Sequence, residues 1–444
     1  MNTSDLLIIG AGPGGYETAV KAAARGLSVT LIERDEAGGT CLNRGCIPTK
    51  TLCRSAEVML TARKAAEFGV CINAPEVDFS VVAARKDTVV AELRSGVETL
   101  LAGVNVVRGE ARFISPSEVE AAGELYTAAR IIVATGSAPS RLPVAGAEYA
   151  LTSDEFLSLD TLPESVIIIG GGVIGLEFAS IMDAFGVAVT VIEFCKEILP
   201  PFDSEVAKRL RMALKKRGIS IVTDARVTSI EKDGKVTYEN KGKEKQAQAE
   251  CVLMAVGRRP VIPAGLVEAG AMLDRGFLKV DDCMKLQWSA EAAPASAELY
   301  AIGDVNGRCM LAHAATAQGD IVLGEKRDLG TVPSAVFTMP ECAMVGLTEE
   351  QCKERGLNVR IGKSTFRANG KALAMGETDG LVKTITDVDT GLLLGCHICG
   401  PHAADLVAEA ALAISCKLPT TSIADTIHSH PTLSETLPSA IESM

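Results

Sequence analysis

Residues 5–33 read DLLIIGAGPGGYETAVKAAARGLSVTLIE. An apolar run leads into three spaced glycines, Gly10, Gly12 and Gly15, and a second apolar run ends at Glu33. In a βαβ unit the first glycine turns the chain, the second admits a pyrophosphate, the third lets helix pack on strand, and the acid takes ribose hydroxyls. The order of strand, turn, helix, strand and acid therefore predicts an α/β fold that binds a dinucleotide.

A second copy of this pattern occupies residues 165–193, SVIIIGGGVIGLEFASIMDAFGVAVTVIE. Its glycines are Gly170, Gly172 and Gly175, and its acid is Glu193. Because both copies carry the acid at the same relative place, two fingerprints imply two bound dinucleotides. Glu193 would repel a 2′-phosphate and only Lys196 stands nearby to attract one, which favours NAD over NADP at the second site.

Three further apolar runs end in glycine and are predicted strands that return the chain to these folds: 130–136, 251–258 and 299–304. Ligands of open α/β sheets lie beyond the carboxyl ends of the strands. Asp304, at the end of the third run, is therefore a candidate for binding a cofactor hydroxyl. A solvated turn aspartate is the alternative interpretation.

The pattern changes after about Gly330. Strands are predicted over 334–337, 381–386 and 392–398, and an apolar helix over 403–415. This part carries no dinucleotide fingerprint, so we expect it to be a separate domain with its own sheet.

Two cysteines lie just after the first fingerprint, in residues 38–50, GGTCLNRGCIPTK. The spacing of Cys41 and Cys46 fits neither the usual zinc sites nor the thioredoxin motif. Five helical positions separate two side chains by about 140°, so bridging this pair needs a distorted turn, for which Gly45 and Pro48 supply suitable backbone. Next to a dinucleotide site the pair indicates redox chemistry on sulfur. A zinc site is the plainest alternative, but it would have only two sulfur ligands nearby.

Composition narrows the class of protein. The 444 residues carry a formal charge of −12, which argues against nucleic acid or an anionic membrane as a partner. The length suggests about three domains, and no apolar run approaches the roughly 20 residues needed to cross a bilayer. The first predicted strand starts so close to Met1 that we expect no signal peptide, and therefore a cytoplasmic enzyme.

The chain has thirteen cysteines. Their odd number and the length of the chain argue against a secreted disulfide scaffold. Isolated cysteines such as Cys71, Cys251, Cys283 and Cys416 are expected to be small apolar residues, and most of the thiols to be reduced and in the core.

The last domain holds four histidines, His397, His402, His428 and His430. Most isolated histidines are satisfied surface or core residues. His430 is the exception in this sequence, because Glu435 stands five residues on and could orient the imidazole as the acid of a catalytic dyad does. The spacing alone leaves both interpretations open.

Taken together, these segments resemble the flavin disulfide reductases from end to end. The resemblance is carried by residues 39–50, the two fingerprints, Gly303-Asp304, Leu311-Ala312-His313 and the motif over 428–435, HSHPTLSE. Leu42, Ile47 and Thr49-Lys50 are similar to the branch of the family that oxidises dihydrolipoamide, whereas glutathione reductases typically have valines and Lys-Lys in this loop. Other disulfide reductases, NADPH-dependent ones included, and a non-catalytic flavoprotein of the same fold are the alternatives.

The resemblance implies a homodimer with FAD in the first fold and NAD in the second. Cys41 would exchange with the substrate, and Cys46 would face the flavin. His430, oriented by Glu435 and delivered from the other subunit, would be the base. The dithiol substrate would be a lipoyl group on another protein, since we expect no lipoyl module before Leu6.

The implied domains are an FAD-binding domain in two parts, 1–145 and 265–331, an NAD-binding domain, 146–264, and an α+β dimerisation domain, 332–444. The implied FAD-binding residues are Gly10, Gly12, Gly15, Glu33, Thr40, Lys50, Ala111, Thr135, Gly136, Asp304 and Ala312. The implied NAD-binding residues are Gly170, Gly172, Gly175, Glu177, Glu193, Val227 and Gly257. Lys50 is expected beside the flavin with Glu177 as its partner, and no metal is expected.

Overall fold

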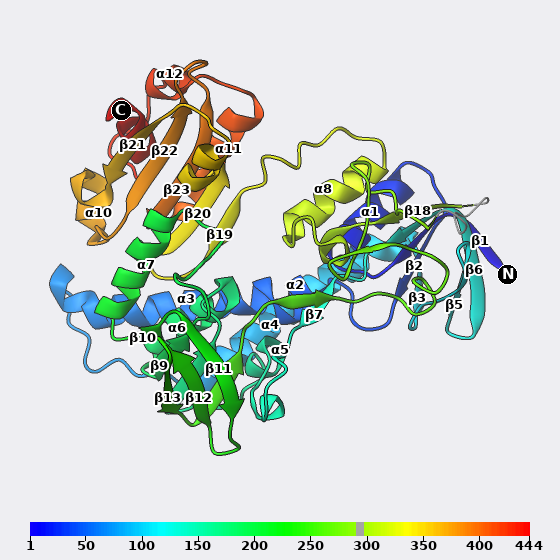
Figure 1. The fold of residues 1–444 in the computed structure, drawn as a ribbon, viewed down its shortest axis with the longest axis horizontal. Helices are drawn as coiled ribbons and strands as arrows, with labels where there is room; N and C mark the ends of the chain where they lie inside the picture. Colours follow the sequence, from blue (N-terminus) through cyan, green and yellow to red (C-terminus); the bar gives the residue numbers. More distant parts are fainter. Residues whose placement is uncertain (290–296) are drawn as a thin grey trace. The chain divides into compact units, whose positions relative to one another are not determined.

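The first fingerprint folds into β1 (Asn2–Ile9), α1 (Pro13–Ala24) and β2 (Val29–Glu33), with the two strands parallel (Figure 1). The chain is described by a computed structural model for residues 1–289 and 297–444. Leu6, Leu7 and Ile8 are fully buried, as expected for a central parallel strand covered on both faces. Gly10 has φ +102°, and a Cβ there would lie 2.5 Å from the carbonyl oxygen of Ala134, so only glycine fits the turn.

The first sheet has the order β3-β2-β1-β6-β5-β4, and β18 also pairs with β6. The added strands are β3 (Asn105–Arg108), β4 (Arg112–Ser115), β5 (Glu118–Ala121), β6 (Glu124–Val133) and β18 (Glu298–Ala301). The predicted strands over 130–136 and 299–304 therefore do return to this sheet. The helices of this part of the chain include α2 (Gly39–Arg44), α4 (Phe79–Leu100) and α8 (Ala312–Val322), and α3 (Cys46–Lys64) begins in it.

The second fingerprint forms a smaller parallel sheet with the order β10-β9-β8-β14. Its elements are β8 (Ser165–Ile169), α6 (Val173–Phe185), β9 (Ala188–Ile192), α7 (Ser204–Lys216), β10 (Ser220–Val222) and β14 (Cys251–Met254). An antiparallel sheet of β11 (Ala225–Ile230), β12 (Lys235–Asn240) and β13 (Lys243–Gln248) precedes β14. A short helix, α5 (Ser153–Phe156), precedes the whole fold.

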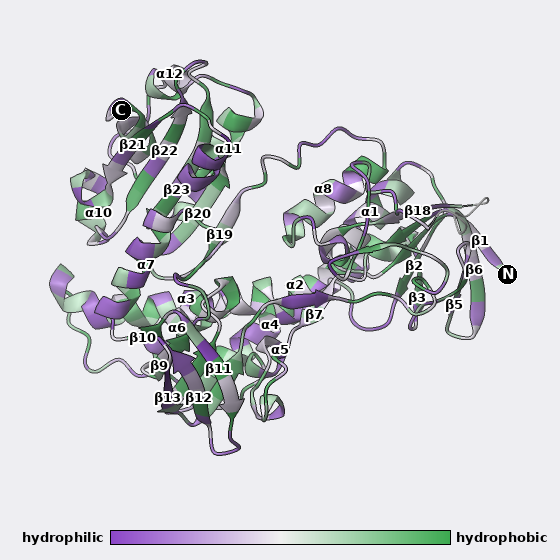
Figure 2. Cartoon of the chain, in the orientation of Figure 1, coloured by the Kyte–Doolittle hydropathy of each residue, from purple (hydrophilic) through white to green (hydrophobic). Residues whose placement is uncertain are grey.

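The C-terminal part is an antiparallel sheet with the order β19-β20-β23-β22-β21. Its strands are β19 (Ser334–Val336), β20 (Glu341–Gly346), β21 (Val359–Thr365), β22 (Leu381–Asp387) and β23 (Leu393–Gly400). Hydrophobic and hydrophilic residues both occur along these strands (Figure 2). The helix α11 (Ala403–Ser415), at the predicted place, packs on one face, where Val407 joins Val345, Val382 and Ile398 in the core. The other helices are α9 (Glu349–Glu354), α10 (Gly370–Met375), α12 (Thr420–Ala424) and α13 (Thr436–Glu442).

Two short strands mark where the chain leaves the first fold and returns to it: β7 (Ser137–Pro139) pairs antiparallel with β15 (Arg258–Pro260). The contacts divide the chain into two units. One comprises Met1–Thr51, Val81–Ser140 and Gly257–Leu329, and the other Leu52–Ser80, Arg141–Val256 and Gly330–Met444. In the part of the chain that the structure describes, none of the helices is both long and apolar enough to traverse a membrane.

Candidate active site

The acid of the first fold is held by two backbone groups. The Glu33 carboxylate accepts the N–H of Ala11 at 2.6 Å and the N–H of Asp35 at 2.8 Å. Gly12 is the N-cap of α1, so the N–H groups of its first turn face the end of the sheet where Glu33 lies. A helix N-terminus beside a fixed carboxylate is the arrangement that binds a pyrophosphate and its ribose.

A cavity of about 220 Å³ adjoins this carboxylate. Its lining residues are Ala11, Glu33, Ala37, Glu98, Leu101, Val106 and Arg108. The apolar walls suit an adenine ring, and Glu33 at the edge suits ribose hydroxyls. The residues present therefore fit the adenosine part of FAD.

A second carboxylate follows β18. Asp304 lies in the 3-10 turn Gly303–Asn306, where its Oδ2 accepts a hydrogen bond from the hydroxyl of Ser137 at 2.5 Å. The guanidinium of Arg258 in turn donates to the Ser137 hydroxyl at 2.7 Å. Sequence reasoning selected Asp304 but missed Ser137 and Arg258, because only the β7–β15 pairing brings residues so far apart in sequence together.

The remaining residues expected at the flavin are spread over the same unit. Ala111 is buried between β3 and β4, Thr40 lies in α2, and Ala312 is the first residue of α8. Gly136 has φ +66°. The hydroxyl of Thr135, just before β7, donates to the carbonyl of Val261, just after β15. This hydrogen bond therefore extends the pairing of β7 with β15.

The two motif cysteines are brought together by a break in the helix. Cys41 lies in α2 and Cys46 begins α3, with Gly45 between them at φ −149° and ψ −110°. A Cβ on Gly45 would lie 2.9 Å from the carbonyl oxygen of Thr40. The distorted turn expected from the spacing is therefore present, both thiols are free, and Cys46 is near enough to raise the pKa of Cys41.

The surroundings of Cys41 shift its pKa. The neighbouring Cys46 thiol and burial both raise the pKa of Cys41, while the charge of Lys50 opposes the shift. Among the described residues, no cluster of three or more histidine, cysteine or acidic side chains could hold a metal ion.

The second fold repeats the geometry of the first. The Glu193 carboxylate accepts the N–H of Gly171 at 2.5 Å and the N–H of Cys195 at 2.6 Å, the same pattern that Glu33 makes with Ala11 and Asp35. Two of the three fingerprint glycines, Gly170 and Gly175, are required by the backbone itself. Gly170 has φ +110°, Gly172 is the N-cap of α6, and a Cβ on Gly175 would lie 2.1 Å from the carbonyl oxygen of Gly170.

Other residues expected at the NAD site lie around this fold. Val227 is buried in β11, and Gly257 follows β14 with φ +100°. Glu177 is buried in α6, and its Oε1 accepts the N–H of Phe337 at 3.0 Å. Lys50 belongs to one unit and Glu177 to the other, so their expected pairing stays a prediction.

The histidine and acid of the C-terminal motif are in contact. Nδ1 of His430 lies 2.9 Å from Oε1 of Glu435. The other carboxylate oxygen accepts the N–H of Thr432 at 2.8 Å. The expected orientation of the imidazole by the acid is therefore present, and 80% of the His430 side chain is exposed.

The other histidines of this domain have structural surroundings. His397 is fully buried, with Nε2 2.9 Å from the carbonyl of Leu347. Both nitrogens of His428 are used, by Glu409 and by the carbonyl of Thr426. His402 is the N-cap of α11 and has a left-handed backbone. Among these four, His430 is the one whose geometry matches an oriented base.

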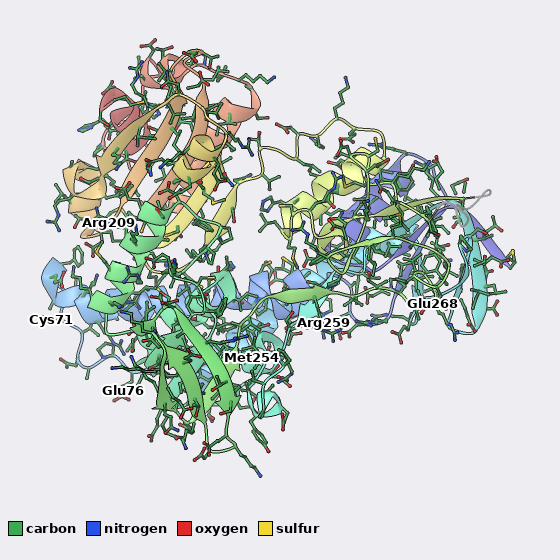
Figure 3. All side chains as sticks on the ribbon, viewed as in Figure 1. Cys71, Glu76, Arg209, Met254, Arg259 and Glu268 are labelled. Atoms are coloured by element: carbon green, nitrogen blue, oxygen red, sulfur yellow. The ribbon has the colours of Figure 1, made fainter. Side chains whose placement is uncertain are left out.

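The expectation about isolated cysteines was wrong for three of those named. Cys71, Cys283 and Cys416 are exposed, and Cys251 is partly buried. Cys71 lies in the loop after the 3-10 turn Ala65–Phe68 (Figure 3), and Cys416 is the C-cap of α11, so each follows the end of an element where the chain turns to the surface. The buried thiols are Cys53, Cys342, Cys352, Cys396 and Cys399.

Sequence comparison with known proteins gives one family over both parts of the chain. The sequence profile of the pyridine nucleotide-disulphide oxidoreductases matches residues 4–319, and that of their dimerisation domain matches residues 332–441. The chain is 40% identical to a dihydrolipoyl dehydrogenase of Bacillus subtilis, over 98% of this chain and 96% of the relative. It is 42% identical to that of Thermus scotoductus, over 100% and 98%.

A solved structure has the same fold. The HOCl-induced flavoprotein disulfide reductase RclA from Escherichia coli matches with a TM-score of 0.86 and 29% identity, over 99% of both chains.

Proposed function

The chain belongs to the pyridine nucleotide-disulphide oxidoreductase family, and we propose that it oxidises protein-bound dihydrolipoamide to lipoamide with NAD+. The observation that carries this proposal is the contact between the Cys41 and Cys46 thiols beside the first dinucleotide fold. A bridgeable thiol pair at that place passes two electrons between a dithiol and a dinucleotide cofactor. The dihydrolipoyl dehydrogenases with about 40% identity over almost the whole chain support the choice of substrate.

In the first step, Nε2 of His430 takes the proton from one thiol of the substrate. The resulting thiolate attacks the Cys41 sulfur of the Cys41–Cys46 disulfide, the sulfur–sulfur bond breaks, and Cys46 leaves as a thiolate.

In the second step, the remaining substrate thiol attacks the substrate sulfur of the mixed disulfide. Lipoamide is released, and the proton of that thiol passes to the departing Cys41. The two electrons of the substrate then reside in the Cys41–Cys46 dithiol. FAD, when bound, supplies the acceptor chemistry that carries them on to NAD+.

Residues of the two dinucleotide folds would bind and orient FAD and NAD. Glu33 and the α1 N-terminus would hold the adenosine and pyrophosphate of FAD, and Asp304 a hydroxyl of its chain. Glu193 would hold the adenosine ribose of NAD in the second fold. The N–H groups of Gly171 and Cys195 hold the Glu193 carboxylate in place. The carboxylate would therefore repel a 2′-phosphate at this position.

The active unit would be a homodimer, in which His430 and Glu435 of one subunit serve the cysteines of the other. The dimerisation-domain match over 332–441 supports this arrangement. The partner would be a lipoyl-bearing protein of a 2-oxoacid dehydrogenase or glycine cleavage complex.

The deciding experiment compares substrates on the purified holoenzyme. Dihydrolipoamide with NAD+ should be oxidised at least 10²-fold faster than NADH or NADPH is consumed with glutathione disulfide. A second disulfide reductase activity is suggested by the likeness to RclA, so other disulfides belong in the same assay. If dihydrolipoamide is a poor substrate while another disulfide is reduced rapidly, the proposed substrate is wrong and the family chemistry stands.

A further inference from the structure

A second pair of cysteines lies face to face in the C-terminal sheet. In the antiparallel pairing of β20 with β23, Cys342 is directly opposite Cys399. Both side chains are fully buried. The catalytic cysteines belong to the other unit of the chain, so the mechanism does not use this pair.

The phase of the ladder brings the two side chains close. Just past the end of β20, the N–H of Leu347 donates to the carbonyl of Leu394 at 2.8 Å, which makes that opposed pair a hydrogen-bonded one. Hydrogen-bonded and non-hydrogen-bonded pairs alternate along an antiparallel ladder. Five positions back, Cys342 and Cys399 therefore form a non-hydrogen-bonded pair, in which the Cα atoms are about 4.5 Å apart and the side chains are closest.

This spacing suits a disulfide. Disulfides join residues whose Cα atoms are roughly 4.4 to 6.8 Å apart, so the two strands need not separate or slide for the bond to form. Burial and then the neighbouring Cys399 thiol raise the pKa of Cys342, just as the neighbouring Cys46 thiol raises that of Cys41.

We propose that Cys342 and Cys399 are a second redox pair, which a peroxide oxidises to a cross-strand disulfide inside the dimerisation domain. One thiol attacks hydrogen peroxide, gains an oxygen as a sulfenic acid and releases one water. The second thiol attacks that sulfur, the disulfide forms and the second water leaves. The two thiols thus lose two hydrogens and two electrons, and one peroxide becomes two waters.

Burial sets the rate of this reaction. Hydrogen peroxide is small enough to follow water into a sheet that opens locally, whereas a lipoyl group or glutathione is not. Burial raises the pKa of Cys342, so little of this thiol is present as the reactive thiolate at neutral pH, and we expect it to react slowly. Burial of both side chains would also shield the finished disulfide from dithiol substrates.

The disulfide would act on stability and leave catalysis intact. It would tie β20 to β23 and close the segment 343–398 into a loop, which restricts the unfolded chain. Glu341, next to Cys342, accepts the N–H of Ala404 at the start of α11 at 3.0 Å. The oxidised domain should therefore unfold at a higher urea concentration while the enzyme keeps its dithiol oxidation rate.

The test uses the holoenzyme treated with hydrogen peroxide, then with dihydrolipoamide to restore the catalytic pair. After alkylation and digestion with a glutamate-specific protease, Cys342 is the only cysteine in the peptide 342–349. Cys399 shares the peptide 378–409 with Cys396. We expect these two peptides to be linked and two hydrogens lighter than the sum of the free peptides, and the urea midpoint to be raised.

Two variants make the assignment sharp. Cys396→Ala removes another buried thiol from β23. Cys396 is three residues from Cys399, so the two side chains lie on opposite faces of the sheet. Cys396→Ala should keep both the linkage and the stabilisation, now with Cys399 as the only thiol of its peptide. Cys399→Ala should lose both. Peptide 342–349 recovered in the alkylated form from fully peroxide-treated wild type, or linked to any other cysteine, would overturn the proposal without reference to either variant.

Discussion

Nδ1 of His430 lies 2.9 Å from Oε1 of Glu435, whose other oxygen accepts the N–H of Thr432 at 2.8 Å. The carboxylate is thus fixed by one backbone donor and in turn fixes the ring. In the neutral imidazole the proton then resides on Nδ1, and Nε2 is left as an acceptor. In the single chain 80% of the side chain is exposed, so Nε2 can face a group that lies outside its own chain.

We expect His430→Gln to lower kcat/KM for dihydrolipoamide oxidation by on the order of 10²-fold or more, because it removes the base. Reduction of the bound flavin by NADH should change by less than about two-fold, since that step does not involve the imidazole. Stopped-flow measurement of the two half-reactions separates the effects. Equal losses in both would show that His430 supports the fold and does not act as the base.

Glu435→Gln should lower kcat/KM for dihydrolipoamide oxidation less than His430→Gln does, because the base remains. The N–H of Thr432 and then His430 lower the pKa of Glu435, so its carboxylate stays charged until the pH falls below the ordinary range of a glutamate. The dyad is therefore complete at neutral pH and is lost only in acid. Glu409→Gln is the matched control, since it removes the equivalent partner of His428 and should leave the pH profile of dithiol oxidation unchanged.

The sequence alone predicted those parts of the fold and site that one local pattern of residues determines. Gly10, Glu33, Gly170 and Glu193 follow from spacing within about thirty residues, because a βαβ unit is a local structure with a fixed register of turn, helix and acid. The contact of His430 with Glu435 spans five residues and followed from spacing in the same way.

Sequence reasoning failed where long-range pairing decides the contact. Arg258 reaches Ser137 only because β15 pairs with β7. Cys342 meets Cys399 only because β20 and β23 adopt one particular register. Neither register can be read from either strand alone, since it is set by turns and by packing across the whole sheet.

We expect Cys46→Ser to abolish the long-wavelength absorbance of the two-electron-reduced enzyme. Cys46 is the proposed flavin-side thiol, so its thiolate would donate charge to the flavin. Cys41→Ser should instead retain such a band in the oxidised enzyme, because Cys46 can no longer be tied in a disulfide. Visible spectra of both variants test this, and a band that survives in Cys46→Ser would reverse the two roles.

Coenzyme selectivity should depend on Glu193. Glu193→Ser combined with Phe194→Arg removes the fixed carboxylate and adds a guanidinium at a position that is 68% exposed. We expect the ratio of kcat/KM for NADPH to that for NADH to rise by on the order of 10²-fold, as charge repulsion is exchanged for a phosphate contact. Phe194→Arg alone is the control and should shift the ratio much less. A wild type that uses both coenzymes equally would contradict the role given to Glu193.

A buried ion pair should stabilise the second unit. Nζ of Lys383, a side chain that is 2% exposed, lies 2.9 Å from Oδ2 of the fully buried Asp203. Burial by itself pushes the pKa of Asp203 up, but the hydrogen bond from Lys383 and neighbouring charges hold it below its ordinary value. The depressed pKa of a carboxylate means that this stabilisation is present above the ordinary pKa and is lost as the pH falls through the lowered one.

Lys383→Met should therefore lower the free energy of unfolding by about 3 to 5 kcal/mol at neutral pH, because Asp203 is left buried without a cation. Lys383→Met combined with Asp203→Asn should recover most of this loss, since the amide oxygen can still accept the N–H of Glu205 at the start of α7. Urea unfolding of the three proteins measures the difference. A double variant as unstable as the single one would show that packing of the lysine chain, and not the buried charge, is responsible.

The last prediction concerns which subunit supplies the base. If His430 of one subunit serves the cysteines of the other, Cys41→Ser and His430→Gln homodimers are both inactive, but their heterodimer has one site built from two intact halves. Random mixing of equal amounts should then restore about a quarter of wild-type activity, because half of the dimers are mixed and each has one working site of two. The matched control mixes wild type with the double variant Cys41→Ser/His430→Gln. Those heterodimers should be inactive when the base is shared across the interface, and half-active when each chain uses its own histidine, so the two mixtures give opposite results under the two arrangements.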